Sequence, residues 1–118
     1  MTNETESDER PILVWTTWPD TAAAEAASGA LVERRLAACA VMLPDLRSVY
    51  RWQGRVESAT EVGLLLKTRS GLAEALTAAI VEIHPYEVPA VLVVDTLSAA
   101  AAYAAWIVAE TAPDGAAS

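Results

Sequence analysis

The sequence predicts one α+β domain in which a four-stranded antiparallel sheet carries helices on one face. Three observations lead to this fold class. Strand-like and helix-like segments alternate between clear turn and capping signals. The chain has 118 residues, which suits a single hydrophobic core. Its composition, 53% hydrophobic and 20% charged, excludes a disordered chain.

The first two elements are a strand and a helix. Residues 12–17 form a short β-prone run that ends at Pro19. The alanine-rich segment 22–38 follows it, and Asp20 or Thr21 can serve as the N-cap. We therefore expect a helix that runs to about residue 38.

The next two elements predict a β-hairpin. Apolar and polar positions alternate towards the end of segment 40–53, and we expect residues 44–45, Pro-Asp, to interrupt this strand. Gly54 lies in the predicted hairpin turn. Residues 56–68 predict the returning strand.

The last three elements are a helix, a strand and a helix. The apolar residues of segment 70–83 have helical spacing, and Pro85 ends the pattern. Residues 90–94 predict a short apolar strand, and residues 99–110 predict the final helix. We expect both helices to have serine N-caps, Ser70 and Ser98.

The element order is therefore β-α-β-β-α-β plus a C-terminal helix. This is the order of a ferredoxin-like plait, an antiparallel sheet with helices on one face. We expect the domain to span residues 11–111, between an acidic flexible tail at 1–10 and a second flexible tail at 112–118.

Composition excludes several classes of protein. The formal net charge is −8 and no basic stripe is present, which argues against nucleic-acid binding. No apolar run reaches the ~20 residues of a membrane span, and the polar N-terminus does not resemble a secretory signal. A single cysteine, Cys39, excludes an internal disulfide framework, so we expect a reducing, cytoplasmic location.

Two strands predict an oligomer. Residues 64–66 and 91–94 are runs of consecutive apolar residues, so their side chains point to both faces of the sheet. Helices on one face leave the other face without a cover, and another copy of the chain is the simplest partner.

Several short motifs occur together between residues 12 and 111. Each is weakly specific alone, but the set resembles the CutA family, which is named for divalent-cation tolerance. The matching segments are Thr17-Trp18-Pro19-Asp20, Arg35-Leu36-Ala37-Ala38-Cys39-Ala40, Ser48-Val49-Tyr50-Arg51-Trp52-Gln53-Gly54, Glu61 with Leu66-Lys67-Thr68, His84-Pro85-Tyr86-Glu87-Val88-Pro89, and Tyr103 with Trp106-Ile107.

The resemblance implies a ferredoxin-like fold and a tight homotrimer similar in architecture to the PII signalling proteins. Family members are associated with copper tolerance and metal binding, and no catalysed reaction comes with the pattern. Some bacterial relatives carry a cysteine near Trp15-Thr16 and a second histidine at Ile83. This chain has neither, so the resemblance implies weak rather than tight copper binding.

His84 is the only histidine and the expected metal ligand, because a neutral imidazole binds divalent cations. The structural alternative is that it only ends a helix, where an imidazolium interacts well with the helix dipole. Cys39 is interpreted as a small packed hydrophobe rather than a ligand.

The other candidate residues line a cleft in this prediction. Glu87 is either a cation ligand or half of an intersubunit salt bridge, and Tyr86 lies beside it between two prolines. Tyr50 and Trp52 alternate on the hairpin as interface anchors or as cleft walls. Lys67 is expected to pair with a carboxylate, and the candidate partners are Glu57 and Glu61.

The sequence therefore predicts a cytoplasmic, homotrimeric CutA-like protein that responds to divalent cations. We expect it to lack enzymatic activity, because no nucleophile or phosphate loop accompanies His84 and Glu87. No cofactor is expected to bind tightly, and Cu(II) or another divalent cation is the expected weak ligand. Two alternatives stay open, a PII-like sensor of a small anionic metabolite that uses Lys67, and a purely structural trimeric scaffold.

Overall fold

The structure is a computed structural model that describes residues 9–113 of the chain. The predicted tails at 1–10 and 112–118 therefore lie largely outside the described residues. The elements in chain order are β1 (Pro11–Trp18), α2 (Thr21–Glu33), β2 (Cys39–Trp52), β3 (Arg55–Arg69), a 3₁₀ turn (Ser70–Leu72), α3 (Ala73–Ile83), β4 (Val91–Asp95) and α4 (Ala101–Glu110).

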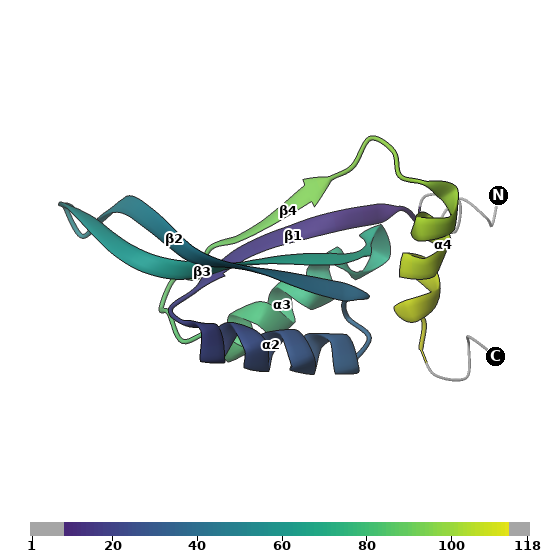
Figure 1. Cartoon of the computed structure of the whole chain (residues 1–118), viewed down its shortest axis with the longest axis horizontal. Coiled ribbons are helices and arrows are strands. Elements are labelled where there is room, and N and C mark those ends of the chain that lie inside the picture. The colour runs from purple at the N-terminus through teal and green to yellow at the C-terminus, as the bar shows by residue number, and fades with distance from the viewer. Residues whose placement is uncertain (1–8, 114–118) are drawn as a thin grey trace.

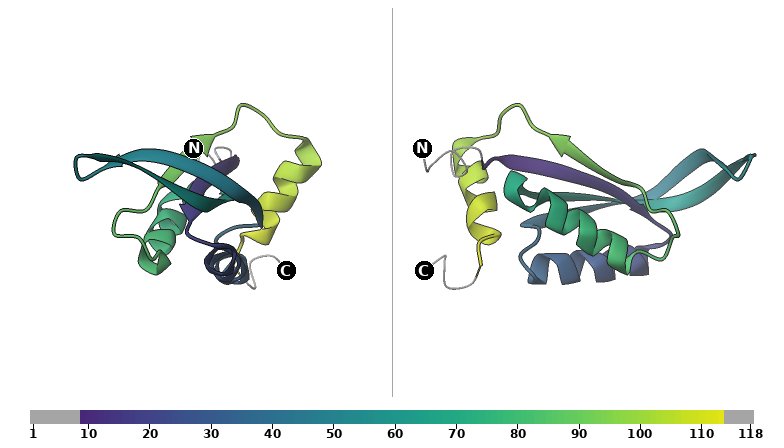
Figure 2. Two further views of the ribbon diagram at one scale, coloured as in Figure 1. Left: turned by 60° about the vertical axis from the view of Figure 1, so that its left-hand side comes forward. Right: turned by 180° about the vertical axis from the view of Figure 1, so that it is seen from behind.

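The four strands form one antiparallel sheet in the order β2-β3-β1-β4. Helices α2 and α3 lie side by side under one face, and α4 stands across the end of the sheet (Figures 1 and 2). The predicted α+β class and antiparallel four-stranded sheet are confirmed. No helix within residues 9–113 is long and apolar enough to cross a membrane.

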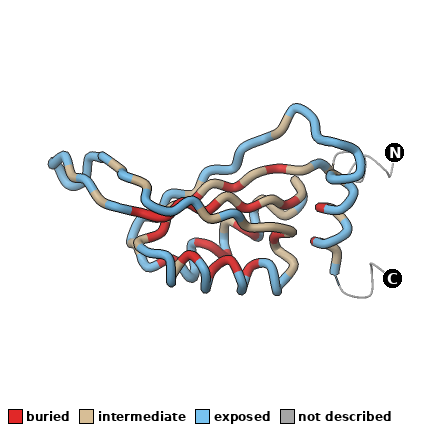
Figure 3. Tube along the Cα trace, in the orientation of Figure 1, coloured by how far each residue is buried: buried red, intermediate tan, exposed pale blue. Residues whose placement is uncertain are grey.

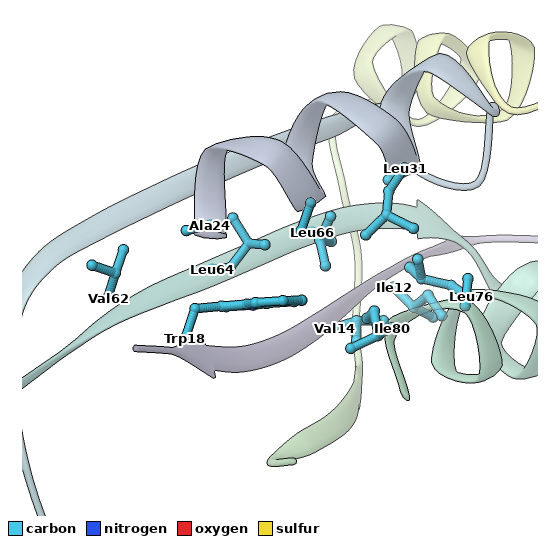
Figure 4. Close-up of a cluster of buried hydrophobic side chains, with 13 residues drawn as sticks. Ile12, Val14, Trp18, Ala24, Leu31, Val62, Leu64, Leu66, Leu76 and Ile80 are labelled. Carbon is cyan, nitrogen blue, oxygen red and sulfur yellow. The ribbon is translucent and has the colours of Figure 1, made fainter. Parts of the chain in front are cut away.

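The core lies between the sheet and the two helices. Burial alternates strictly along β1, so that Val14 and Trp18 face the helices while their neighbours face away. Leu64 and Leu66 of β3 and Leu31 of α2 complete the centre of this cluster (Figures 3 and 4). Each fully buried leucine contributes about 1.5–3 kcal/mol to the free energy of unfolding.

The opposite face of the sheet is apolar and largely uncovered. The register places Val41, Leu65 and Leu92 on this face, across the sheet from the buried side chains. Leu92 is 61% exposed and Val41 is 40% exposed. The predicted two-sided apolar character of the strands is therefore present, and no helix of the described residues lies over this face, because α4 stands at the end of the sheet (Figure 2).

Helix α2 ends five residues earlier than the sequence suggested. The backbone of Arg35 is left-handed, with a φ of 61°. The N–H groups of Arg35 and Leu36 bond to the carbonyls of Val32 and Leu31, which closes the helix in a Schellman motif. Glycine usually holds this position, so the arginine gave no sequence signal for the helix end.

Strand β2 continues through Pro44 and Asp45 instead of stopping there. The register shifts between Leu43 and Leu46, where two residues of β2 face Val62 of β3. This is a β-bulge, and Asp45 takes a φ of 62° within it. The bulge removes the need for a break, so the prediction of an interrupted strand was wrong.

Neither predicted serine cap is formed. Ser70 begins the 3₁₀ turn, and its hydroxyl bonds to Glu9. The N-caps of α3 and α4 are Leu72 and Ala100, which have no side-chain capping bond. The Glu9 carboxylate accepts instead from the Gly71 N–H, at 3.0 Å, so an acidic residue before β1 satisfies the start of the turn.

Candidate functional site

A cleft of about 690 Å³ lies where the β2–β3 hairpin extends past the end of β1. Trp18, the last residue of β1, pairs with Val62, so residues 55–61 of β3 pair only with β2. The loop after α3 closes the other side of the cleft. The lining residues are Thr17, Ser48, Tyr50, Trp52, Glu57, Glu61, Tyr86, Glu87, Val88, Pro89 and Ala90.

Glu61 is the buried polar centre of the cleft. Its side chain belongs to a residue only 7% exposed. The Ser48 hydroxyl donates to Oε1 at 2.6 Å, and the Tyr86 hydroxyl donates to Oε2 at 2.8 Å. No lysine, arginine or histidine within residues 9–113 forms an ion pair with Glu61. Buried carboxylates are normally paired with a cation, so this one is unusual.

Tyr86 is held as a hydrogen-bond donor. Burial, together with the hydrogen bond to Glu61 and the negative charge of that carboxylate, raises the pKa of Tyr86 far above its usual value. The phenol therefore stays protonated throughout the physiological range. It orients the carboxylate but brings no positive charge to it.

Two further carboxylates make the cleft acidic, and two aromatic rings form part of its wall. Glu57 stands directly opposite Tyr50 in the hairpin register and on the same face of β3 as Glu61. Trp52 and Tyr50 are 36% and 41% exposed, so their rings are open to a ligand. Glu87 is exposed on the loop. The lining holds these three carboxylates and no lysine or arginine.

His84 lies beside the cleft, and both of its ring nitrogens are engaged. Nε2 donates to the carbonyl of Thr17 at 2.7 Å, and Nδ1 accepts the backbone N–H of Tyr86 at 3.1 Å. The imidazole also stacks on Trp18, with centroids 4.0 Å apart. These bonds define a neutral tautomer with the proton on Nε2. A metal at His84 would have to displace one of the two bonds.

The predicted alternative for His84 fits its position but not its charge. His84 is the C-cap of α3, as that alternative requires. An imidazolium could not accept the Tyr86 N–H. The hydrogen bond from Tyr86 therefore takes the place of the charge–dipole interaction that this alternative assumed. Within residues 9–113 no group of three or more histidine, cysteine, aspartate or glutamate side chains is arranged to hold a metal ion.

Lys67 is not part of the cleft, and its predicted pairing with Glu57 or Glu61 was wrong. Its ammonium donates to the Tyr103 hydroxyl at 3.0 Å and lies 5.3 Å from the centre of that ring. The hydrogen bond to Tyr103 raises the pKa of Lys67. Lys67 is the thirteenth residue of β3, which starts at the hairpin, so it lies too far along the strand to reach the cleft. Cys39 faces Lys67 across the β2–β3 pair as a half-buried free thiol.

The structure brings the predicted residues Tyr50, Trp52, Tyr86 and Glu87 together in one cleft, and it adds Glu57 and Glu61, which the sequence had suggested only as partners of Lys67. A sequence signal was available for Glu57. A two-residue hairpin turn fixes which residues face each other, and it puts Tyr50 opposite Glu57. The contact between Glu61 and Tyr86 depends on the loop path, which no local pattern specifies.

Comparison with known proteins gives the family of this chain. The model of the CutA1 divalent ion tolerance protein family matches residues 12–110. The divalent-cation tolerance protein CutA of Pyrococcus horikoshii is 43% identical over 100 residues, which cover 85% of this chain and 97% of that protein. The chloroplastic protein CutA of Arabidopsis thaliana is 35% identical over 96 residues, 81% of this chain and 53% of that protein.

The solved structures agree with the sequence matches. The crystal structure of the divalent ion tolerance protein CutA1 from Ehrlichia chaffeensis superposes with a TM-score of 0.85 at 33% identity, and the match covers 89% of this chain and 98% of that one. The fold and the arrangement of strands and helices are therefore shared. This chain belongs to the CutA1 divalent ion tolerance family.

Proposed function

We propose that this protein is a non-enzymatic, cytoplasmic homotrimer that responds to divalent cations and binds them weakly at its acidic clefts. One observation carries the proposal. The buried Glu61 carboxylate has hydroxyl donors on both oxygens and no cation partner among residues 9–113, and Glu57 and Glu87 line the same cleft. A cleft with three carboxylates attracts cations.

The trimer is supported by the uncovered apolar face of the sheet. Leu92, Val94 and Val41 leave more apolar surface exposed there than a monomer usually tolerates. The strand order and helix placement fit a ferredoxin-like plait, in which this face is free to pack against other copies. A trimer would hold three equivalent clefts, and a second chain would supply the ligands that one chain lacks for a metal.

Copper or a similar ion is the metal we propose to test first. Carboxylate oxygens and one imidazole form a borderline ligand set that Cu(II) and Zn(II) both accept. Because His84 uses both nitrogens internally, we propose the carboxylates as the first ligands and His84 as a ligand only after rearrangement. This arrangement predicts weak binding.

Calorimetric titration of Cu(II) and Zn(II) into the assembled protein tests the proposal. We expect saturable binding that Glu61→Gln weakens and that Glu25→Gln, an equal charge change on exposed α2, leaves unchanged. His84→Ala reports whether the imidazole joins the ligand set, provided that the variant remains folded. Absence of saturable binding in the native protein would contradict a metal function.

The two alternatives make different predictions. A PII-like sensor of an anionic metabolite needs positive charge at the cleft, and the lining residues provide none. Anions would then compete with cations in the same titration. A structural scaffold would bind neither, and Trp52→Ala would dissociate it. Sedimentation equilibrium of that variant and of the native protein measures the mass directly, and a monomeric native protein would contradict the trimer.

A further inference from the structure

The three carboxylates of the cleft are spread along it rather than gathered at one point. Glu57 and Glu61 lie on one face of β3, four residues apart, so their Cα atoms are about 13 Å apart at ~3.3 Å per residue. Ligands of one metal ion lie within about 2.0–2.6 Å of it. This spacing explains why no single-ion cluster is present among the described residues. It suits a ligand that carries several separated positive charges.

Glu61 offers a specific seat for one of those charges. Ser48 and Tyr86 each occupy one acceptor position on a different carboxylate oxygen, and each oxygen has a second lone pair. A primary ammonium has three donors and could neutralise this buried carboxylate without displacing either hydroxyl. A single ammonium group therefore satisfies the charge that the fold leaves unpaired.

The walls between the carboxylates are apolar and aromatic. Tyr50 and Trp52 line one side, and Val88 and Pro89 line the other. Aromatic faces attract ammonium groups, and they also bury methylene chains. The volume of about 690 Å³ is that of a small-molecule site and far exceeds the need of a bare ion.

We propose that this cleft binds a linear aliphatic polyamine, with one ammonium on Glu61, others on Glu57 and Glu87, and the methylene chain against Tyr50 and Trp52. The inference rests on the proposed cation role of the cleft and names a different class of cation for it. Charges separated by trimethylene and tetramethylene spacers match carboxylates separated along a strand. An inorganic ion or a monoamine can occupy only one of these positions.

Calorimetric titration of spermidine into the assembled protein tests the inference. We expect saturable binding at each chain, tighter than that of putrescine, whereas the uncharged analogue 1,4-butanediol should not bind. Glu61→Gln should weaken spermidine binding about tenfold or more, because it removes a charge-assisted hydrogen bond. Glu57→Gln should weaken spermidine more than putrescine, because the shorter diamine does not span both carboxylates.

A matched control distinguishes a specific binding site from general electrostatic attraction between a polycation and an acidic protein. Glu25→Gln makes the same charge change on the exposed face of α2 and should leave the affinity unchanged. Equal weakening by Glu25→Gln and Glu61→Gln would overturn the inference. Because Glu61 is buried, the melting temperature of the Glu61→Gln variant should be measured beside its titration. If that variant unfolds, Glu57→Gln on the cleft rim provides the test.

The same titrations distinguish this inference from the proposed metal function. Metal binding without spermidine binding overturns the polyamine inference and leaves the metal proposal in place. Spermidine binding without metal binding supports the inference and removes the metal role. If neither binds, both proposals fail.

Discussion

The Nε2 atom of His84 lies 2.7 Å from the carbonyl oxygen of Thr17 and ties the loop after α3 to the end of β1. The other ring nitrogen accepts the Tyr86 N–H, and the Tyr86 hydroxyl in turn holds Glu61. A chain of three hydrogen bonds thus connects the end of β1, through His84 and Tyr86, to the buried carboxylate of the cleft. In this structure His84 acts as a positioning residue.

Replacement of His84 by alanine should lower the stability of the fold. The variant loses two hydrogen bonds and the stacking on Trp18, and it leaves a cavity beside that ring. We expect a cost of about 2–4 kcal/mol in the free energy of unfolding. Chemical denaturation at constant protein concentration measures this. His84→Gln keeps a hydrogen-bond donor and an acceptor, so it should lose less stability than His84→Ala. An equal loss would show that stacking on Trp18 contributes more to stability than the two hydrogen bonds.

The sequence predicted the order of the elements because their periodicities are strong. Burial alternates along β1 as the residue types do, and α3 has one apolar face with Leu76 and Ile80. The end of α2 was missed because Arg35 takes a left-handed backbone that its side chain does not reveal. The Lys67–Tyr103 contact was missed because it joins elements 36 residues apart, and only the path of α4 creates it.

Tyr86 should resist alkaline titration. Its pKa is raised in the folded state, chiefly by burial and by the bond to Glu61, whereas in the unfolded chain it ionises near pH ~10. The stability from this tyrosine is therefore complete below about pH 10 and falls as the pH rises further. Ultraviolet titration should show one of the three tyrosines ionising only as the protein unfolds. In Tyr86→Phe that late step should vanish.

Substitution of Gly63 by alanine should destabilise the fold. Gly63 faces Thr17 across the sheet, and a Cβ there would meet the Trp15 ring and lie 2.7 Å from Leu46 Cδ1. The side chains around it would have to shift, at a cost of about 1–3 kcal/mol. Thermal unfolding measures the loss. Gly29→Ala, where no atom lies within 4 Å of the added carbon, is the matched control and should be neutral or stabilising.

Neutralising Glu9 should weaken the attachment of the chain start to the sheet. Its carboxylate lies 2.6 Å from Arg69 Nη1, accepts the Gly71 N–H, and is largely shielded from solvent. Glu9→Gln keeps the shape but removes the charge, so the Arg69 guanidinium loses its ion pair. Because both side chains are mostly buried, we expect the free energy of unfolding to fall by about 1–2 kcal/mol, which is more than the loss of an exposed ion pair would cause.

Hydrogen exchange of the Gly71 amide and chemical denaturation measure this loss together. Arg69 also donates to Thr111 after α4, so weaker anchoring of its guanidinium should increase exchange at the end of α4 as well. Asp95→Asn is the control, because it removes an exposed ion pair that joins Arg10, the residue after Glu9, to the edge strand β4. Equal losses in the two variants would mean that burial adds nothing to the Glu9–Arg69 pair.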